Sequence, residues 1–176
     1  MTKKRVLIAN RGEIALRIIR SVKELDMEAI AVYSDVDADS LHVKRADEAY
    51  YLGGSLPSES YRNMKKLMKA VSDTNADMVH PGYGFLAENA DFAKAVEKKD
   101  VIWIGPNPET IKSMGDKIES RKLISKAGLN PVPGQLKPSR TKREATKDAT
   151  EFGYPVALKA AHGGGGKGLR IVHNEK

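Results

Sequence analysis

The first 105 residues alternate between short, unbroken apolar runs and longer segments with helical periodicity, and this alternation constrains the fold most strongly. A strand that is buried on both faces of a sheet reads as a continuous apolar run, whereas a half-exposed strand alternates. Strands that alternate with helices favour a parallel sheet covered on both faces. We therefore predict a Rossmann-like, doubly wound α/β domain, with strands at Arg5–Ala9, Ala29–Tyr33, Met78–His80 and Val101–Gly105.

The segments between these runs favour helices. From Glu13 to Leu25 the apolar residues fall on one face of a helix, and the charged residues lie elsewhere. Further helices are predicted at Tyr61–Ser72 and Asn89–Lys98. In such an architecture we expect the first strand, Arg5–Ala9, to lie inside the sheet and to be flanked on both sides.

A turn cluster, Gly105-Pro106-Asn107-Pro108, ends this pattern, and we predict two domains, residues 1–115 and residues 116–176. Two strands joined by a glycine-rich stretch close the chain, and two strands alone are marginally stable. We therefore expect the sequence to be part of a longer chain. The predicted elements of this part are helices at Glu109–Met114, Lys117–Ala127 and Lys142–Phe152, and strands at Tyr154–Ala160 and Leu169–Val172.

The composition excludes several classes of protein. There is no cysteine, which rules out disulfide scaffolds, cysteine-ligated zinc and thiol nucleophiles. No apolar run approaches the roughly 20 residues that span a bilayer, and no targeting segment is recognised, so a cytoplasmic protein is expected. The net charge of +7 arises entirely after Gly115. This excess fits either a solvated lysine-rich face or a region that meets a polyanion.

The stretch from Ala161 to Gly168 carries the clearest chemical signal. The four consecutive glycines, residues 163–166, have no side chains to pack, but their backbone can approach phosphate oxygens closely, and Lys167 adds positive charge. Lys159 ends a strand that reads as buried, where a lysine needs an anionic partner. The segment is not a P-loop, because the first glycine and the hydroxyl residue of that motif are missing. A plain hairpin loop is the alternative.

Three other turns are compatible with a binding role or with a purely structural one. The turn Asn10-Arg11-Gly12-Glu13 lacks the glycines of a dinucleotide site and is either an ordinary strand-to-helix turn or functional. The loop from His80 to Asn89 is either a shaped pocket wall or a tight turn with an asparagine cap. Lys117, after a capping Asp116, opposes the helix dipole unless an anion binds there.

Taken together, these residues resemble the biotin carboxylase family, which comprises the biotin carboxylase components of acetyl-CoA, propionyl-CoA and pyruvate carboxylases. The matching stretches follow the family's order and spacing over essentially the whole chain. They are residues 8–18, 46–49, 80–89, 104–106, 114–117 and 159–168.

The resemblance implies a Rossmann-like N-terminal domain that leads into an ATP-grasp fold. It also implies an activity, in which bicarbonate is activated with Mg-ATP through carboxyphosphate, and biotin on a carrier protein is then carboxylated. By resemblance, Lys117 and Lys159 are ATP-phosphate lysines. Gly163, Gly164, Gly165, Gly166, Lys167 and Gly168 form the family's glycine-rich flap over ATP. Tyr83 is similar to a tyrosine near the biotin pocket.

The same resemblance places Arg20 and Glu24 at a homodimer interface, and implies a biotin carboxyl carrier protein and a carboxyltransferase as partners. It puts the family's catalytic and Mg²⁺-binding residues beyond residue 176, so this piece should be inactive alone. The sequence does not identify the acyl acceptor. Another ATP-grasp ligase of the carbamoyl-phosphate synthetase kind, or a non-catalytic interaction domain, is the alternative. Nucleic-acid binding is disfavoured, because the few aromatic residues are not interleaved with the basic ones.

Overall fold

The computed structural model of the chain describes residues 3–115, 117–135, 137–160 and 168–175. The chain separates into two compact units, Met1–Lys112 and Ser113–Lys176. Within the described ranges, none of the helices combines the length and the apolar character that crossing a bilayer requires.

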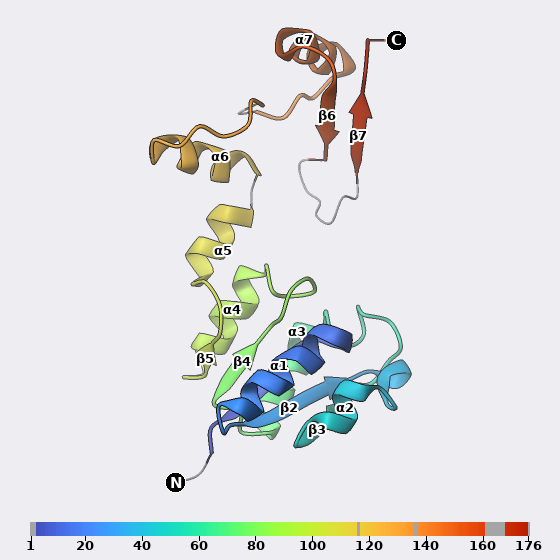
Figure 1. Ribbon diagram of the computed structural model, residues 1–176, viewed down its shortest axis with the longest axis vertical. Coiled ribbons are helices and arrows are strands. Elements are labelled where there is room, and N and C mark those ends of the chain that lie inside the picture. The colour runs from blue at the N-terminus through green and yellow to red at the C-terminus, as the bar shows by residue number, and fades with distance from the viewer. Residues whose placement is uncertain (1–2, 116, 136, 161–167, 176) are drawn as a thin grey trace. The chain divides into compact units, whose positions relative to one another are not determined.

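The first unit is built on a five-stranded parallel sheet with the strand order β3-β2-β1-β4-β5 (Figure 1). β1 lies in the middle and pairs with β2 on one side and with β4 on the other, so that Leu7 faces both Ile30 and Val79. The predicted parallel sheet with an internal first strand is therefore confirmed. The strands are β1 (Arg5–Ile8), β2 (Glu28–Tyr33), β3 (Glu48–Tyr51), β4 (Met78–His80) and β5 (Ile102–Trp103).

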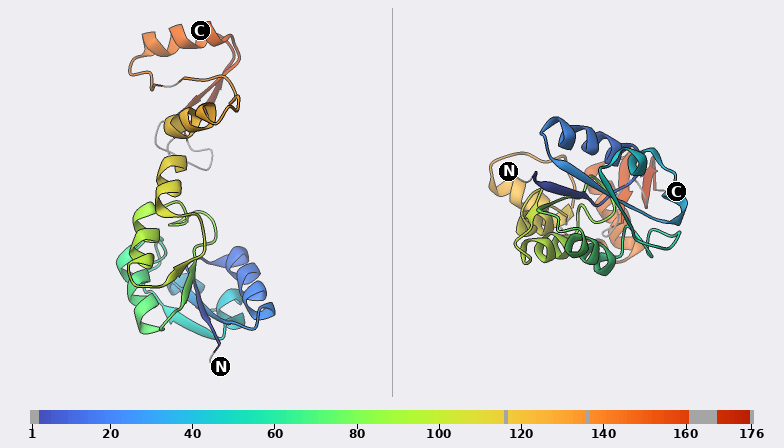
Figure 2. Two further views of the ribbon diagram at one scale, coloured as in Figure 1. Left: turned by 90° about the vertical axis from the view of Figure 1, so that its left-hand side faces the viewer. Right: turned by 90° about the horizontal axis from the view of Figure 1, so that it is seen from below.

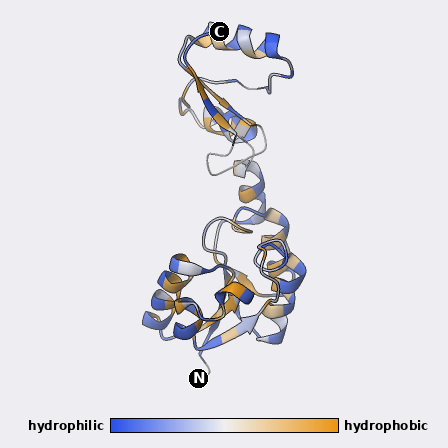
Figure 3. Ribbon diagram, turned by 90° about the vertical axis from the view of Figure 1, so that its right-hand side faces the viewer, coloured by the Kyte–Doolittle hydropathy of each residue, from blue (hydrophilic) through white to orange (hydrophobic). Residues whose placement is uncertain are grey.

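Helices cover both faces of this sheet (Figure 2). On one face, Val6 and Ile8 pack with Ile18 of α1 (Gly12–Glu24), and α2 (Leu41–Arg45) lies beside α1. On the other face, Leu7 belongs to a core that includes Phe92 and is supplied by α3 (Met64–Asp73) and α4 (Ala90–Glu97). Figure 3 shows the resulting pattern, with hydrophobic residues concentrated in the inner strands and hydrophilic residues on the outer surfaces of the helices. Two buried faces explain why the inner strands read as continuous apolar runs.

Three elements are absent from the sequence-based prediction, namely β3, α2 and the short 3₁₀-helix η1 (Asp35–Asp37). β3 is an edge strand and its side chains are mostly exposed, so it has no apolar run to reveal it. Its start is fixed by Asp47, whose carboxylate accepts a hydrogen bond from the backbone N–H of Ala29 at 2.9 Å. The hydrogen bond that places β3 beside β2 thus joins two residues, Ala29 and Asp47, that lie 18 positions apart in the sequence.

The loops before α3 and α4 end in asparagine caps. The side chain of Asn89 accepts a hydrogen bond from the backbone N–H of Phe92 at 2.8 Å, which is the helix cap considered for this loop. Asn63 does the same for Lys66 at 3.1 Å. The third helix therefore begins at Met64, three residues later than predicted, because turns occupy the preceding residues.

The second unit contains helices and one two-stranded antiparallel ribbon. The ribbon pairs β6 (Val156–Lys159) with β7 (Leu169–Val172), as the two closing strands predicted. Thr141 caps α7 by accepting a hydrogen bond from the backbone N–H of Glu144 at 3.2 Å. The helices are α6 (Lys117–Lys126) and α7 (Lys142–Phe152), while α5 (Pro108–Gly115) spans the division between the units.

Candidate functional site

Two loops meet at the carboxyl edge of the sheet, where the direction of winding reverses between β1 and β4. Residues 9–13 follow β1, and residues 81–89 follow β4. Open α/β sheets bind ligands at this position, in the crevice outside the strand ends. Both loops stand out in the sequence, and the structure brings them together.

The side chain of Asn10 ties these loops to one another. Its amide donates hydrogen bonds to the carbonyl oxygens of Pro81 at 2.7 Å and Tyr83 at 2.8 Å, and its oxygen accepts from the backbone N–H of Arg11 at 2.9 Å. Gly82 has a φ of +65°, and a Cβ there would lie 2.8 Å from the Asn10 amide nitrogen. The Asn10 side chain and the close approach of Gly82 thus hold the two loops together at the carboxyl edge of the sheet.

Arg11 forms the centre of a second network, which could not be predicted from the sequence. Its guanidinium binds both carboxylate oxygens of Asp37, at 2.6 and 2.5 Å. The same carboxylate accepts hydrogen bonds from the hydroxyl of Tyr61 at 2.6 Å and from those of Ser34 and Ser40, each at 3.1 Å. The Asp37 side chain is 2% exposed and that of Arg11 44% exposed. Five donors on one buried carboxylate satisfy the charge that burial would otherwise penalise.

The electrostatics of this network follow from its geometry. The hydrogen-bonded guanidinium of Arg11 holds the pKa of Asp37 well below its usual range. Burial, together with the hydrogen bond to Asp37, raises the pKa of Tyr61 to about 12. Burial lowers the pKa of His42, whose Nε2 lies 3.4 Å from the carbonyl oxygen of Val32. Asp37 therefore stays charged and Tyr61 stays protonated near neutral pH, and their contacts join the turn at Arg11 to the loop that carries Phe85.

The loop after β4 is attached to this network through aromatic rings. Phe85 stacks on Tyr61, with ring centroids 5.3 Å apart and planes 13° apart. His80 Nδ1 accepts a hydrogen bond from the backbone N–H of Gly82 at 3.1 Å, which assigns the proton of the neutral ring to Nε2. Burial and the nearby charge of Arg17 lower the pKa of His80.

Tyr83 projects from this fixed loop, and its residue is 61% exposed. Its hydroxyl donates a hydrogen bond to the carboxylate of Glu13, in the first turn of α1. This bond joins the two loops a second time, and it comes from the turn that sequence reasoning had left undecided.

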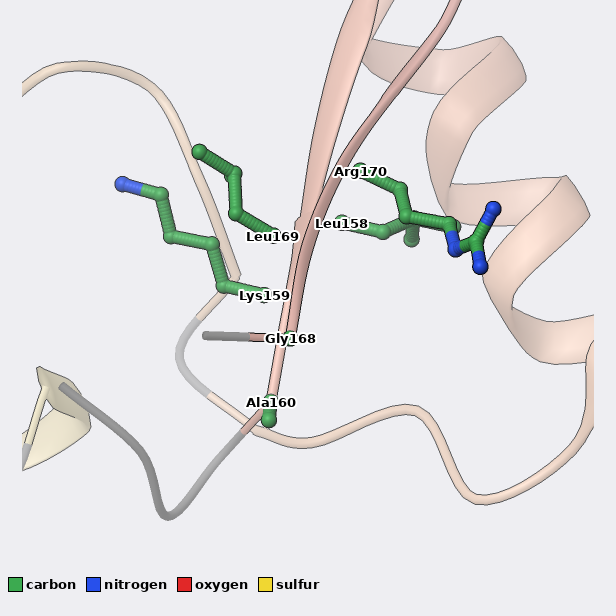
Figure 4. A pocket seen from close by; sticks show the side chains of 6 residues that line it. All are labelled: Leu158, Lys159, Ala160, Gly168, Leu169 and Arg170. Carbon is green, nitrogen blue, oxygen red and sulfur yellow. The ribbon is translucent and has the colours of Figure 1, made fainter. Parts of the chain in front are cut away.

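The second candidate region lies on the β6–β7 ribbon. Side chains alternate across it, so Lys159 and Leu169 project on one side, and Leu158 and Arg170 on the other (Figure 4). Together with Ala160 and Gly168, these residues line a hollow that is open to solvent. The expectation that Lys159 ends a buried strand is wrong. Lys159 is exposed, as are its neighbours Leu158 and Leu169, because no second layer covers the ribbon in the described part of this unit.

Several predicted ligand residues lie outside the described residues. These are Gly163, Gly164, Gly165, Gly166 and Lys167, together with the side chain of Lys117. Asp116, the predicted helix cap, also lies outside the described residues. Gly168 is described, with a φ of +75°, and its carbonyl oxygen accepts a hydrogen bond from the backbone N–H of Ala160 at 3.2 Å. The ribbon therefore continues by one bond beyond Lys159, to the base of the glycine-rich segment.

The described residues contain no group of three or more His, Asp or Glu side chains that could hold a metal ion. The family resemblance implies Mg²⁺, but the described residues do not contain a set of ligands for it. Arg20 and Glu24, the predicted interface residues, lie one turn apart on α1 and are both exposed.

Two family models match the chain in succession. The model described as "Biotin carboxylase, N-terminal domain" matches residues 2–111. The chain belongs to the biotin carboxylase family. A second model, "Carbamoyl-phosphate synthase L chain, ATP binding domain", matches residues 116–176, which agrees with an ATP-grasp domain that begins after the Rossmann-like one.

Known biotin carboxylases resemble the chain over nearly all of its length. It is 49% identical over 172 residues to the mitochondrial propionyl-CoA carboxylase alpha chain of Homo sapiens, which covers 98% of this chain and 24% of the relative. The biotin carboxylase domain of the Hydrogenobacter thermophilus 2-oxoglutarate carboxylase, solved as a dimer with MgADP, ADP and bicarbonate, has a TM-score of 0.91 at 45% identity, over 99% of this chain and 38% of that one. A Campylobacter jejuni biotin carboxylase has a TM-score of 0.91 at 44% identity, over 99% and 39% of the two chains. The chain thus spans about a quarter of the curated relative and two fifths of the solved structures.

Proposed function

We propose that this chain forms the N-terminal part of an ATP-dependent biotin carboxylase, which activates bicarbonate with Mg-ATP and carboxylates biotin on a carrier protein. The observation that carries the proposal is the match along 98–99% of the chain to biotin carboxylases, one of them solved with MgADP and bicarbonate. A carbamoyl-phosphate synthetase is less well supported, because residues 2–111 match the N-terminal domain of biotin carboxylase.

In this proposal the second unit supplies ATP-phosphate contacts. Lys159 carries its charge on an exposed face of the ribbon, and among the described residues no carboxylate pairs with it. Its ammonium group is therefore available to a phosphate. Lys117 would act with it, and Gly163 to Gly168, including Lys167, would close over the nucleotide with their backbone N–H groups. The domains assigned on this basis are residues 1–115 and 116–176.

The remaining assignments concern partners. Tyr83 would contact biotin, and a biotin carboxyl carrier protein and a carboxyltransferase would complete the reaction. A homodimer through Arg20 and Glu24 is supported by their exposure on α1 and by the dimeric structure of a relative. The Mg²⁺ ligands would come from outside the described residues. We place the protein in the cytoplasm.

The decisive experiment is Lys159→Met in the full-length carboxylase subunit. A positioned cation stabilises charge that develops on the phosphoryl group, so bicarbonate-dependent ATP cleavage should fall by at least about 10²-fold. The fold should survive, because the side chain is exposed. Lys147→Met is the matched control, since Lys147 is an exposed lysine on α7 in the same unit, and its variant should retain full activity.

Two results would contradict the proposal. Unchanged activity in Lys159→Met would remove this lysine from the ATP site. Bicarbonate-dependent ADP release by the purified 176-residue chain would show that residues outside it are not needed, whereas we expect weak ATP binding and no cleavage.

A further inference from the structure

The backbone around Tyr83 is held more firmly than an exposed loop requires. Its carbonyl oxygen and that of Pro81 both accept hydrogen bonds from the amide of Asn10, and Phe85 stacks on the buried Tyr61. A Cβ on Gly82 would collide with that amide, which shows how closely the loop passes Asn10. The loop therefore presents the ring of Tyr83 from a fixed position.

The hydroxyl of Tyr83 is also fixed, by Glu13. It donates a hydrogen bond to the Glu13 carboxylate, while 61% of the residue faces solvent. This hydrogen bond raises the pKa of the Tyr83 hydroxyl above its ordinary value. An exposed tyrosine gains little stability from such a bond, so the arrangement points to a role in binding.

We propose that Glu13 is a positioning residue that orients Tyr83 and turns its phenol oxygen into a hydrogen-bond acceptor for an N–H group of the substrate. The inference rests on the proposed function, in which Tyr83 contacts biotin.

The chemistry follows from the single proton of a phenol. A tyrosine hydroxyl has one donor and two acceptor lone pairs, and the donor is committed to Glu13. A ligand at the exposed side of the oxygen meets lone pairs only. The ureido ring of biotin offers N–H donors and a carbonyl acceptor, so Tyr83 takes an N–H edge and disfavours the carbonyl. Glu13 thereby selects the orientation of the ring without touching it.

The first test measures the hydrogen bond on the chain itself. Tyrosine labelled with ¹³C at the ring carbon that bears the hydroxyl is titrated by NMR, and the Tyr83 signal is assigned by its loss in Tyr83→Phe. In Glu13→Leu, the pKa of Tyr83 should fall toward that of a free tyrosine. Asp91→Leu is the matched control, because Asp91 is an exposed acid in the first turn of α4 and should leave the Tyr83 titration unchanged. An unaltered titration in Glu13→Leu would overturn the proposal.

The second test measures biotin carboxylation by the full-length subunit. Glu13→Leu should raise the KM for biotin roughly threefold to tenfold, as expected for one hydrogen bond, and leave the KM for ATP unchanged. Glu13→Gln, which retains an acceptor oxygen, should stay close to the unmodified enzyme, whereas a role in helix stability alone would affect both variants alike. Equal KM values for biotin in Glu13→Leu and the unmodified enzyme would refute the positioning role. If the unmodified subunit failed to carboxylate biotin, the proposed function would fail, while the titration would still decide whether Glu13 holds Tyr83.

Discussion

Replacing Asp37 with asparagine should destabilise the first unit strongly, although the two side chains have almost the same shape. The carboxylate accepts five hydrogen bonds, three on Oδ2 and two on Oδ1. An amide keeps one acceptor oxygen, so at least two donors would face an NH₂ group. Breaking a buried ion pair by removing one partner costs about 3–5 kcal/mol. The Arg11 side chain is 44% exposed and can regain water, so we expect a loss of about 2–4 kcal/mol.

Trp103 allows this loss to be measured in the first unit alone. It is the single tryptophan of the chain, it is 7% exposed, and it packs edge-on against Phe92 at 5.5 Å. Urea unfolding followed by tryptophan fluorescence should show a midpoint lower by about 1–2 M in Asp37→Asn. Asp39→Asn is the control, because the side chain of Asp39 is fully exposed and its variant should change stability by less than about 0.5 kcal/mol. Equal midpoints for the two variants would refute the reasoning.

The same measurement has a defined pH dependence. The pKa of Asp37 is lower in the folded chain than in the unfolded chain, so its contribution is fully present above the unfolded pKa of about 3.9. It is lost as the pH falls from there toward the folded pKa. The stability difference between Asp37→Asn and the unmodified chain should therefore be constant from pH 7 to about pH 5 and shrink below about pH 4. A difference that shrank between pH 7 and pH 5 would contradict this assignment.

Two further predictions concern the same loops. Tyr61→Phe should cost about 1–3 kcal/mol, because it removes the hydroxyl that donates to Asp37. The pKa of Tyr61 is raised to about 12 in the folded chain, so this contribution to stability is fully present below about pH 10. In urea unfolding, the difference in unfolding free energy between Tyr61→Phe and the unmodified chain should therefore shrink as the pH rises toward 12. Gly82→Ala and Gly84→Ala both place alanine at a positive φ, but only at Gly82 would the Cβ meet Asn10. The Gly82 variant should therefore be less stable than the Gly84 variant by a further ~1–3 kcal/mol, and equal thermal midpoints would exclude the clash.

The interior of the fold could be predicted from the sequence because burial on two faces leaves a local mark. β1 and β2 are apolar at nearly every position, and the helix between them has one apolar face. The edge strand β3 is exposed on most of its residues and leaves no such mark, although it pairs fully with β2. The error at Lys159 has a related origin, since an apolar run does not say whether another layer covers it.

The candidate site could be predicted only in part. Both loops at the carboxyl edge were identified, because glycines, aromatic residues and charges stand out in short segments. Their partners could not be found in the same way, since Asp37 lies 26 residues from Arg11 and Glu13 lies 70 residues from Tyr83. Hydrogen bonds between loops that are distant in the sequence leave no periodicity, and they emerge only once the strands are in register.

The central position of β1 also determines how the domain is exposed while it is being made. β2 and β3 follow β1 early in the chain, whereas β4, its other neighbour, begins only at Met78. At about 5–20 residues per second, a ribosome needs roughly one to five seconds to extend the chain from the end of β3, at Tyr51, to that point. During this interval, one side of β1 presents unpaired backbone groups beside the apolar residues Val6 and Ile8. Free strand edges of this kind invite pairing with other chains, so the nascent domain depends on prompt arrival of β4 or on protection by a chaperone.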